Sequence, residues 1–148
     1  MKKYIAKNLE ETQKIAADFV KNLSAKKSGN IGATVVGLYG ELGSGKTSFT
    51  QGVARTLGIS QTVVSPTFVI EKIYELSNQN FSHLIHIDAY RIEKSEELIH
   101  LGWKEIIADS ENLIFVEWPE RVANIMPEHI RINFSHIENE QREIEIVA

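Results

Sequence analysis

Residues 40–47 read Gly40-Glu41-Leu42-Gly43-Ser44-Gly45-Lys46-Thr47 and match the phosphate-binding pattern G-x-x-x-x-G-K-S/T at every defined position. The run Thr34-Val35-Val36-Gly37-Leu38-Tyr39 comes directly before them and is typical of a buried strand. A strand that leads through a glycine-rich loop into a helix is the context in which this pattern binds polyphosphates. The sequence therefore predicts a nucleoside triphosphate site at residues 40–47.

The residue types of the loop suit that chemistry. Its glycines leave room for the main chain to curl around a phosphate and can adopt positive φ. Lys46 supplies a positive charge for the β and γ oxygens, and Thr47 is expected to ligate Mg²⁺ through its hydroxyl. A glycine-rich turn that only capped a helix would not need the Lys-Thr pair. The predicted nucleotide-binding residues of the loop are Leu42, Gly43, Ser44, Gly45, Lys46 and Thr47.

Length and composition predict one domain over residues 1–148, large enough to bury a single core. The chain has no cysteine, no signal-peptide pattern at its start and no apolar run near the ~18 residues of a membrane span. A cytoplasmic protein that does not contact a membrane is expected. A net charge of −4 argues against nucleic-acid binding by the protein's own surface, so any RNA is expected to be held by a partner.

Hydrophobic periodicity predicts alternating helices and strands on both sides of the loop. Helices are expected at 12–23 behind an Asn8–Glu11 capping box, at 45–57, from Ser95 to an interruption at Gly102, at 103–108, and as a short stretch at 119–125. Strands are expected at 35–39, 67–76, 82–88, 113–116, 130–134 and 144–146. The predicted fold class is α/β: a P-loop NTPase-like three-layer sandwich with a central mixed, mostly parallel sheet, flanking helices and a C-terminal hairpin.

Two acidic residues end apolar strands. Asp88 follows Leu84-Ile85-His86-Ile87, and Glu117 follows Leu113-Ile114-Phe115-Val116. In an open α/β sheet the ligand crevice lies beyond the carboxyl ends of the parallel strands, so both acids are expected to face the nucleotide. The alternative is that each acid simply marks the point where a buried strand meets water. Together with Lys46, Asp88 and Glu117 form the predicted catalytic set.

The segment Ser65-Pro66-Thr67-Phe68 follows the loop helix. Thr67 is a candidate sensor of the γ-phosphate, as in switch segments that triphosphate orders and hydrolysis releases. A simple turn entering a strand is an equally good interpretation. His83 and His86 suggest a metal by composition, but residues three apart on a strand point to opposite faces, which argues against a zinc site.

Taken together, four segments closely resemble the TsaE (also YjeE) family: residues 40–47, 65–68, His86-Ile87-Asp88-Ala89-Tyr90-Arg91, and Glu117-Trp118-Pro119-Glu120. The likeness extends over nearly the whole chain. It implies an ATPase needed for N6-threonylcarbamoyladenosine formation at position 37 of tRNAs that read ANN codons. It also implies TsaB and TsaD as partners, with TsaC making the threonylcarbamoyl-adenylate and TsaD transferring it.

By matching motifs, the resemblance implies that Thr47 and Glu117 serve Mg²⁺, that Asp88 lies close to it, and that Thr12 lies near the adenine. The roles of the two acids remain open, because either could be the direct ligand while the other orients water. Ser44 stands where alanine is expected, a change that the backbone should accommodate. ATP and Mg²⁺ are thus the expected cofactors.

Other function classes fit less well or remain open. The base-reading tetrapeptide Asn-Lys-x-Asp of GTPases does not occur, which favours ATP, and the arginines do not cluster in sequence as a small-molecule kinase lid would require. A nucleotide-dependent scaffold with little turnover is a further alternative. Because Arg91 is the only arginine within the motifs, slow hydrolysis by the isolated protein and faster hydrolysis with partners are expected.

Overall fold

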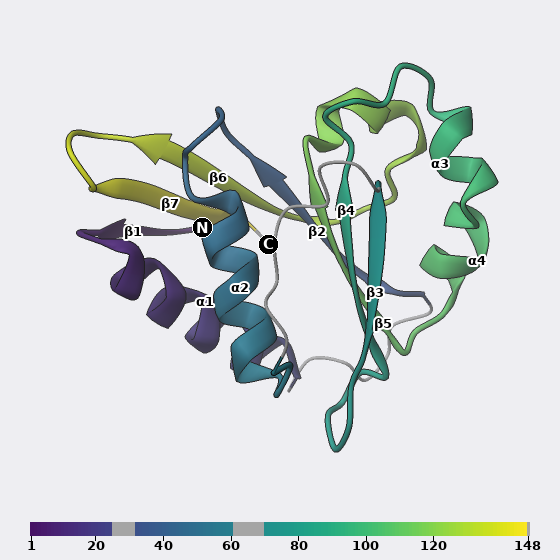
Figure 1. The fold of residues 1–148 in the computed structure, drawn as a ribbon, viewed down its shortest axis with the longest axis horizontal. Helices are drawn as coiled ribbons and strands as arrows, with labels where there is room; N and C mark the ends of the chain where they lie inside the picture. The colour runs from purple at the N-terminus through teal and green to yellow at the C-terminus, as the bar shows by residue number, and fades with distance from the viewer. Residues whose placement is uncertain (25–31, 61–69, 148) are drawn as a thin grey trace.

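The computed structural model describes residues 1–24, 32–60 and 70–147, and a seven-stranded sheet forms its framework (Figure 1). The strand order is β1-β7-β6-β2-β5-β4-β3. The strands are β1 (Lys2–Ala6), β2 (Thr34–Tyr39), β3 (Glu71–Glu75), β4 (His83–Asp88), β5 (Asn112–Glu117), β6 (Ile130–His136) and β7 (Arg142–Val147). The segment Ser65-Pro66-Thr67-Phe68 and the start of the strand predicted at 67–76 lie outside the described residues.

The sheet is mixed, as predicted, but it is not mostly parallel. The four central strands β4, β5, β2 and β6 run parallel to one another. The three outer pairings, β1 with β7, β6 with β7, and β3 with β4, are antiparallel. The prediction of a mostly parallel sheet was therefore wrong for the sheet as a whole, because hairpins and β1 extend both sides of a parallel centre.

Helices cover both faces of this sheet (Figure 1). Helices α1 (Leu9–Ser24) and α2 (Lys46–Thr56) pack together on one face, and α3 (Glu96–His100), α4 (Trp103–Ala108) and the 3₁₀ helix η1 (Pro119–Ile125) belong to the other. Alternate residues of β5 separate the two cores: Leu113 and Phe115 pack with α1 and α2, whereas Ile114 and Val116 pack with the second group. This alternation is what a strand buried on both faces requires.

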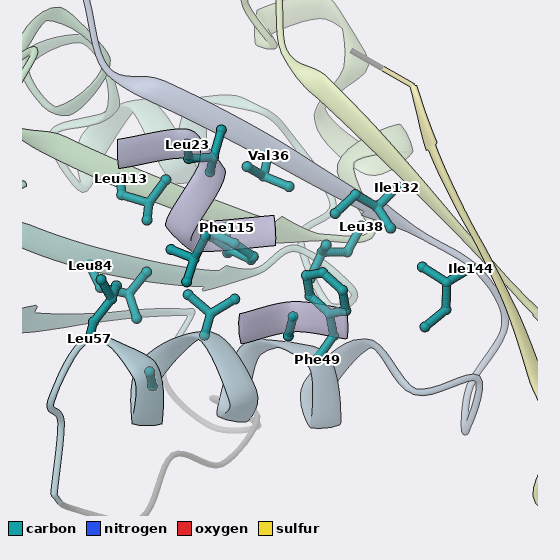
Figure 2. Packing of buried hydrophobic residues seen from close by; sticks show 14 of the residues in the cluster. Leu23, Val36, Leu38, Phe49, Leu57, Leu84, Leu113, Phe115, Ile132 and Ile144 are labelled. Carbon is teal, nitrogen blue, oxygen red and sulfur yellow. The ribbon is translucent and has the colours of Figure 1, made fainter. Parts of the chain in front are cut away.

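Aromatic side chains fill the core beneath α2 (Figure 2). The Phe49 ring lies fully buried and meets Phe134 edge to face, with the ring centroids 5.5 Å apart. Phe19 of α1 lies 5.8 Å from Phe49 and 6.4 Å from Phe115. Tilted and edge-to-face pairs of this kind add about 0.5–1.5 kcal/mol each beyond the burial of their area. The cluster therefore holds α2, and with it the loop that precedes α2, against the sheet.

The ends of the helices confirm some of the predicted caps and correct one. The side chain of Asn8 accepts a hydrogen bond from the Glu11 amide at 2.9 Å, as a capping box requires, and Gly58 ends the loop helix with φ of 86°. Ser95 does not cap α3, because its hydroxyl bonds Asn124 instead. The Glu97 carboxylate accepts from the nearby main-chain amides, and those bonds lower the pKa of Glu97.

Strand β1 was not predicted from the sequence. Its sequence, Lys2-Lys3-Tyr4-Ile5-Ala6, is short and begins with two lysines, and it forms a strand by pairing with distant β7. Lysines are common on edge strands because they discourage pairing with other chains. None of the helices in the described parts of the chain is both long and apolar enough to cross a membrane.

Candidate active site

A cavity of about 760 Å³ lies beyond the carboxyl ends of the central parallel strands. Strand β2 leads into the loop at residues 40–47, and β4 and β5 end at Asp88 and Glu117. The loop, the start of α1 and the C-terminal hairpin surround this space. Of the predicted site residues, Thr12, Leu42, Gly43, Gly45, Lys46, Thr47, Asp88 and Glu117 line the cavity.

Three glycines allow the loop its shape, each with positive φ. A Cβ on Gly40 would lie 2.7 Å from the Phe134 carbonyl oxygen, so this position needs glycine to fit against β6. Gly43 has open space around it and needs glycine for its φ of 75° alone, and Gly45 begins α2 at φ of 109°. At position 40 the fold of the loop itself already requires glycine, and the predicted positive φ occurs at all three glycines, while the predicted clearance for a phosphate stays a prediction.

Lys46 lies across the loop at the start of α2. Its ammonium group donates to the Gly40 carbonyl and lies 3.7 Å from the centroid of the Trp118 ring. Lys46 is only 5% exposed, and this burial lowers the pKa of its ammonium, while the charges of Glu117, Glu120 and Asp88 act in the opposite direction. A cation–π contact of this kind contributes about 0.5–2 kcal/mol.

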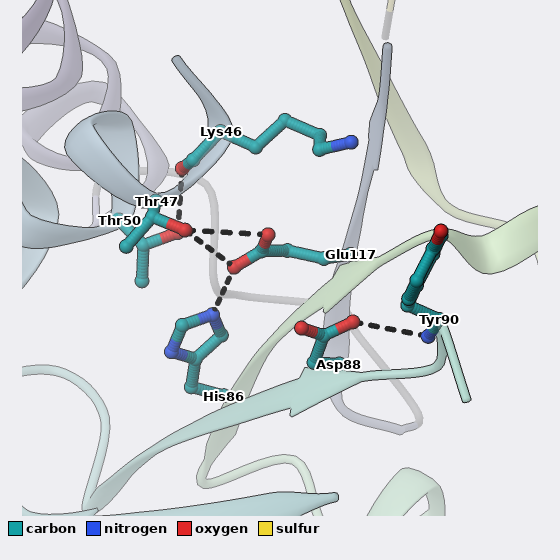
Figure 3. A network of polar contacts seen from close by, with 7 residues as sticks. All are labelled: Lys46, Thr47, Thr50, His86, Asp88, Tyr90 and Glu117. Atoms are coloured by element: carbon teal, nitrogen blue, oxygen red, sulfur yellow. Dashed lines mark hydrogen bonds and ion pairs between the residues drawn. The ribbon is translucent and has the colours of Figure 1, made fainter. Parts of the chain in front are cut away.

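Thr47, Glu117 and His86 form a chain of polar contacts at the base of the cavity (Figure 3). The Thr47 hydroxyl lies 3.2 Å from one carboxylate oxygen of Glu117 and 3.4 Å from the other. The Nε2 atom of His86 lies 2.6 Å from Oε2 of Glu117. Glu117 is 3% exposed, so its carboxylate depends on these partners for the hydrogen bonds that water would otherwise supply.

Asp88 lies beside Glu117 at the same edge of the sheet. The two residues are register partners in the parallel pair β4–β5. The Asp88 carboxylate accepts a hydrogen bond from the Tyr90 amide at 3.0 Å, which holds it at the turn that follows β4 (Figure 3). The structure thus brings both predicted acids to the cavity, and their roles there stay predictions.

The remaining predicted residues differ in their surroundings. Thr12 is buried, and its hydroxyl lies 3.4 Å from the Asn8 carbonyl within the first turn of α1. Leu42 is 70% exposed at the tip of the loop. Ser44 is not among the residues that line the cavity, and its hydroxyl is buried with no hydrogen-bond partner in the part of the chain that the structure describes. Thr67 lies outside the described residues, so its predicted role stays a prediction.

Sequence reasoning missed two residues of this site. Arg142, at the start of β7, donates to the Gly43 carbonyl at 3.2 Å although 99 positions separate them in the chain. Arg91, the arginine that lies within the motifs, also lines the cavity. His86 was considered only as a zinc ligand, and within the described residues no group of three His, Cys, Asp or Glu side chains could hold a metal ion. No local sequence pattern reveals the contacts of Arg142 and His86, since both contacts depend on how the strands pair.

Comparisons with known proteins agree with this geometry. The family described as "Threonylcarbamoyl adenosine biosynthesis protein TsaE" matches residues 6–144. A tRNA threonylcarbamoyladenosine biosynthesis protein TsaE from Borreliella burgdorferi is 43% identical over 61% of this chain and 63% of its own length. Proteins of the same name from Rickettsia typhi and Bacillus subtilis are 33% and 38% identical, over 90% and 77% of this chain and 85% and 69% of their own lengths.

A solved structure gives the same result for the fold. The crystal structure of Bacillus subtilis YdiB superposes with a TM-score of 0.66 and 30% sequence identity, and the match covers 97% of this chain and 82% of that one. The mixed sheet with helices on both faces is therefore shared with YdiB. Since the family match extends from the end of β1 into β7 and so includes the loop and both acids, the chain belongs to the TsaE family.

Proposed function

We propose that this protein is the Mg²⁺-dependent ATP-binding and ATP-hydrolysing component required for threonylcarbamoylation of adenosine 37 in tRNAs that read ANN codons. In this proposal it is a P-loop NTPase-like three-layer sandwich that acts in the cytoplasm with TsaB and TsaD. The main support is the pair Thr47 and Glu117, which face each other beside Lys46 in a cavity large enough for a nucleotide. Membership of the TsaE family supports the role in tRNA modification.

The donor set of the site suits magnesium. Thr47, Glu117 and Asp88 offer only oxygen atoms, which Mg²⁺ prefers, and adjacent ligands of an octahedral Mg²⁺ lie about 2.9 Å apart. The 3.2 Å between the Thr47 hydroxyl and Glu117 is close to that spacing. Bound Mg²⁺ would neutralise charge on the β and γ oxygens of the nucleotide. Thr47 and Glu117 would hold the ion, and Asp88 would either join them or orient water.

The protein's own groups would act mainly by position and charge. Backbone amides of the loop and of the start of α2 would bind the phosphates, and Lys46, which lines the same cavity, would add the positive charge. In this proposal the Lys46 ammonium would exchange its contacts with the Gly40 carbonyl and the face of Trp118 for contacts with the phosphates. If Asp88 does not join Thr47 and Glu117 as a direct ligand, it would orient the attacking water.

Partner activation fits the way in which arginine is used at this site. The guanidinium of Arg142 donates to the carbonyls of Gly43, Asn139 and Gln141, so main-chain oxygens occupy it. Hydrolases of this class without a placed arginine turn over at about 10⁻⁴ to 10⁻² per second, and an arginine supplied by a partner adds about 10³ to 10⁵-fold. We therefore expect slow hydrolysis alone and faster hydrolysis with TsaB and TsaD, which would also hold the tRNA.

Reconstitution tests this proposal. ATP turnover would be measured for the protein alone and with TsaB and TsaD, together with t6A formation on a substrate tRNA in the presence of TsaC. Modification that depends on this chain, with turnover that rises on adding partners, is the expected result. Full ATPase activity in isolation would contradict partner activation, and modification that proceeds equally without this chain would contradict the proposed role.

A nucleotide-dependent scaffold is the main alternative, since the Thr47–Glu117 contact could couple binding to shape without turnover. Glu117→Ala separates the two. If hydrolysis is the function, this variant should bind ATP and the partners yet fail to support repeated rounds of tRNA modification. Unchanged multiple turnover by Glu117→Ala would leave the scaffold as the better account.

A further inference from the structure

His86 occupies a position that a strand buried on both faces normally gives to an apolar residue. It is fully buried in β4, and residues two apart on a strand share a face, so it lies on the side of Leu84. Leu84 belongs to the hydrophobic core beneath α1 and α2. Burying an imidazole there costs free energy unless a hydrogen bond compensates for the loss of water.

The compensation comes from one atom. Nε2 of His86 lies 2.6 Å from Oε2 of Glu117, whereas Nδ1 is buried and has no partner in the described structure. An ionised carboxylate only accepts hydrogen bonds, so the tautomer that fits carries its proton on Nε2 and donates it to Glu117. That tautomer leaves a bare lone pair at Nδ1 rather than an unmatched N–H donor. In the described structure the hydrogen bond of the His86 ring is therefore the one to Glu117.

The Glu117 carboxylate contacts both His86 and Thr47. Oε2 lies between His86 Nε2 and the Thr47 hydroxyl, while Oε1 lies 3.4 Å from the same hydroxyl. A side chain with three rotatable bonds would otherwise choose among several rotamers. A donor that is fixed by the core on one side therefore selects the rotamer that presents the carboxylate to Thr47 and the cavity.

We propose that His86 is a positioning residue for the metal site: its Nε2–H orients Glu117 so that the carboxylate and the Thr47 hydroxyl bind Mg²⁺ together. The inference rests on the proposed function, because it assigns a role in the nucleotide–Mg²⁺ site described above. Outer partners of metal ligands fix ligand orientation, and their loss typically weakens metal affinity by about 10–100-fold. His86 would act through Glu117 and would not touch the nucleotide.

Two amide substitutions test the position of the donor. Glutamine places its side-chain N–H₂ about as far from Cα as Nε2 of histidine, whereas asparagine places it at the level of Nδ1. His86→Gln should keep the bond to Glu117, and His86→Asn should lose it. Both put an amide into the same buried place, so a general cost of burial affects them alike. His83→Gln, on the partly exposed opposite face of the same strand, is a matched control.

The measurement is the Mn²⁺ concentration that half-saturates the complex of full-length protein with ADP, followed by electron paramagnetic resonance, together with ADP affinity in EDTA. We expect His86→Asn to weaken Mn²⁺ binding about 10–100-fold, with wild-type ADP affinity in EDTA. His86→Gln should stay within about threefold of wild type, and the His83 control should not change.

Equal Mn²⁺ affinities for His86→Asn and His86→Gln would overturn the inference. So would a loss of ADP affinity in EDTA that is as large as the loss of Mn²⁺ affinity in His86→Asn. A wild-type protein that binds ADP without any Mn²⁺ site would overturn the proposed function, and this inference with it. Wild-type Mn²⁺ binding with unaffected His86 variants would overturn only the inference.

Discussion

Thr47 and Glu117 are 70 positions apart in the chain, yet the Thr47 hydroxyl lies 3.2 Å from Oε2 of Glu117 at the edge where β5 ends and α2 begins. This contact joins the phosphate loop to the acidic edge of the sheet. It brings together two oxygen ligands of the kind that Mg²⁺ selects.

Loss of the Thr47 hydroxyl should therefore raise the Mg²⁺ concentration that ATP hydrolysis requires. Thr47→Ala removes one oxygen ligand and should raise the Mg²⁺ concentration for half-maximal ATP hydrolysis by about tenfold or more, since even outer partners of a metal contribute 10–100-fold. Thr47→Ser keeps the hydroxyl and should remain close to wild type. A Mg²⁺ titration of ATPase activity compares them, and equal Mg²⁺ requirements for the Ala and Ser variants would argue against Thr47 as a ligand.

Lys46 predicts a pH dependence of ATP affinity. Burial lowers the pKa of its ammonium in the free protein, and a bound polyphosphate favours the charged form and raises that pKa. Affinity should be fullest below the lowered pKa of the free protein and should fall as pH rises from there toward the pKa of the bound state. Calorimetric titrations from neutral to alkaline pH should show this fall beginning below the usual lysine range.

Lys46→Arg serves as the control for that profile, because arginine stays protonated throughout the range. Its affinity should stay flat where the wild type declines. A decline of the same size in Lys46→Arg would assign the pH dependence to another group.

Trp118 should report nucleotide binding. The centroid of its ring lies 3.7 Å from the Lys46 ammonium, which in the proposed function would move to bind a phosphate. Tryptophan emission should therefore change on adding ATP, and Trp118→Phe should abolish the change. The other tryptophan, Trp103, is buried and donates to the Ile125 carbonyl at 3.0 Å, so Trp103→Phe should retain it. Loss of the signal in Trp103→Phe but not in Trp118→Phe would contradict this arrangement.

Phe49 should be the costliest of these residues for stability. Its ring is fully buried between Phe19, Phe115 and Phe134. Phe49→Ala should lower the free energy of unfolding by about 3–5 kcal/mol, because it leaves a cavity under α2. Leu42→Ala, at a site 70% exposed, should change it by less than about 0.5 kcal/mol. Urea denaturation measures the free energy of unfolding of both variants. Similar changes in Phe49→Ala and Leu42→Ala would contradict the assignment of Phe49 to the core.

The parts of the fold that local patterns specify were predictable from the sequence. The strand before the loop, the helix from Lys46 and the break at Gly102 rest on periodicity and on residues with special φ angles, and the structure confirms each of them. Asp88 and Glu117 were placed correctly because the carboxyl ends of parallel strands share an edge.

What the sequence did not reveal depends on contacts between distant segments. Strand β1 exists because β7 lies beside it, and Arg142 reaches Gly43 because the C-terminal hairpin folds over the loop. The sequence suggests for His86 only a zinc pair with His83, whereas its partner in the fold is a single carboxylate on the next strand. The prediction of a mostly parallel sheet was wrong for the same reason, since tertiary packing decides how the strands pair at the edges.

ATP affinity of Lys46→Ala, measured by calorimetry with Mg²⁺ present, tests the central claim that residues 40–47 bind a nucleoside triphosphate. Exposed Lys104→Ala controls for the loss of one positive charge. Hydrogen bonds to charged groups contribute about 1.5–3 kcal/mol, so Lys46→Ala should bind ATP about 10–100-fold more weakly, while Lys104→Ala binds as wild type. A folded Lys46→Ala protein that binds Mg²⁺·ATP with unchanged affinity would contradict the claim.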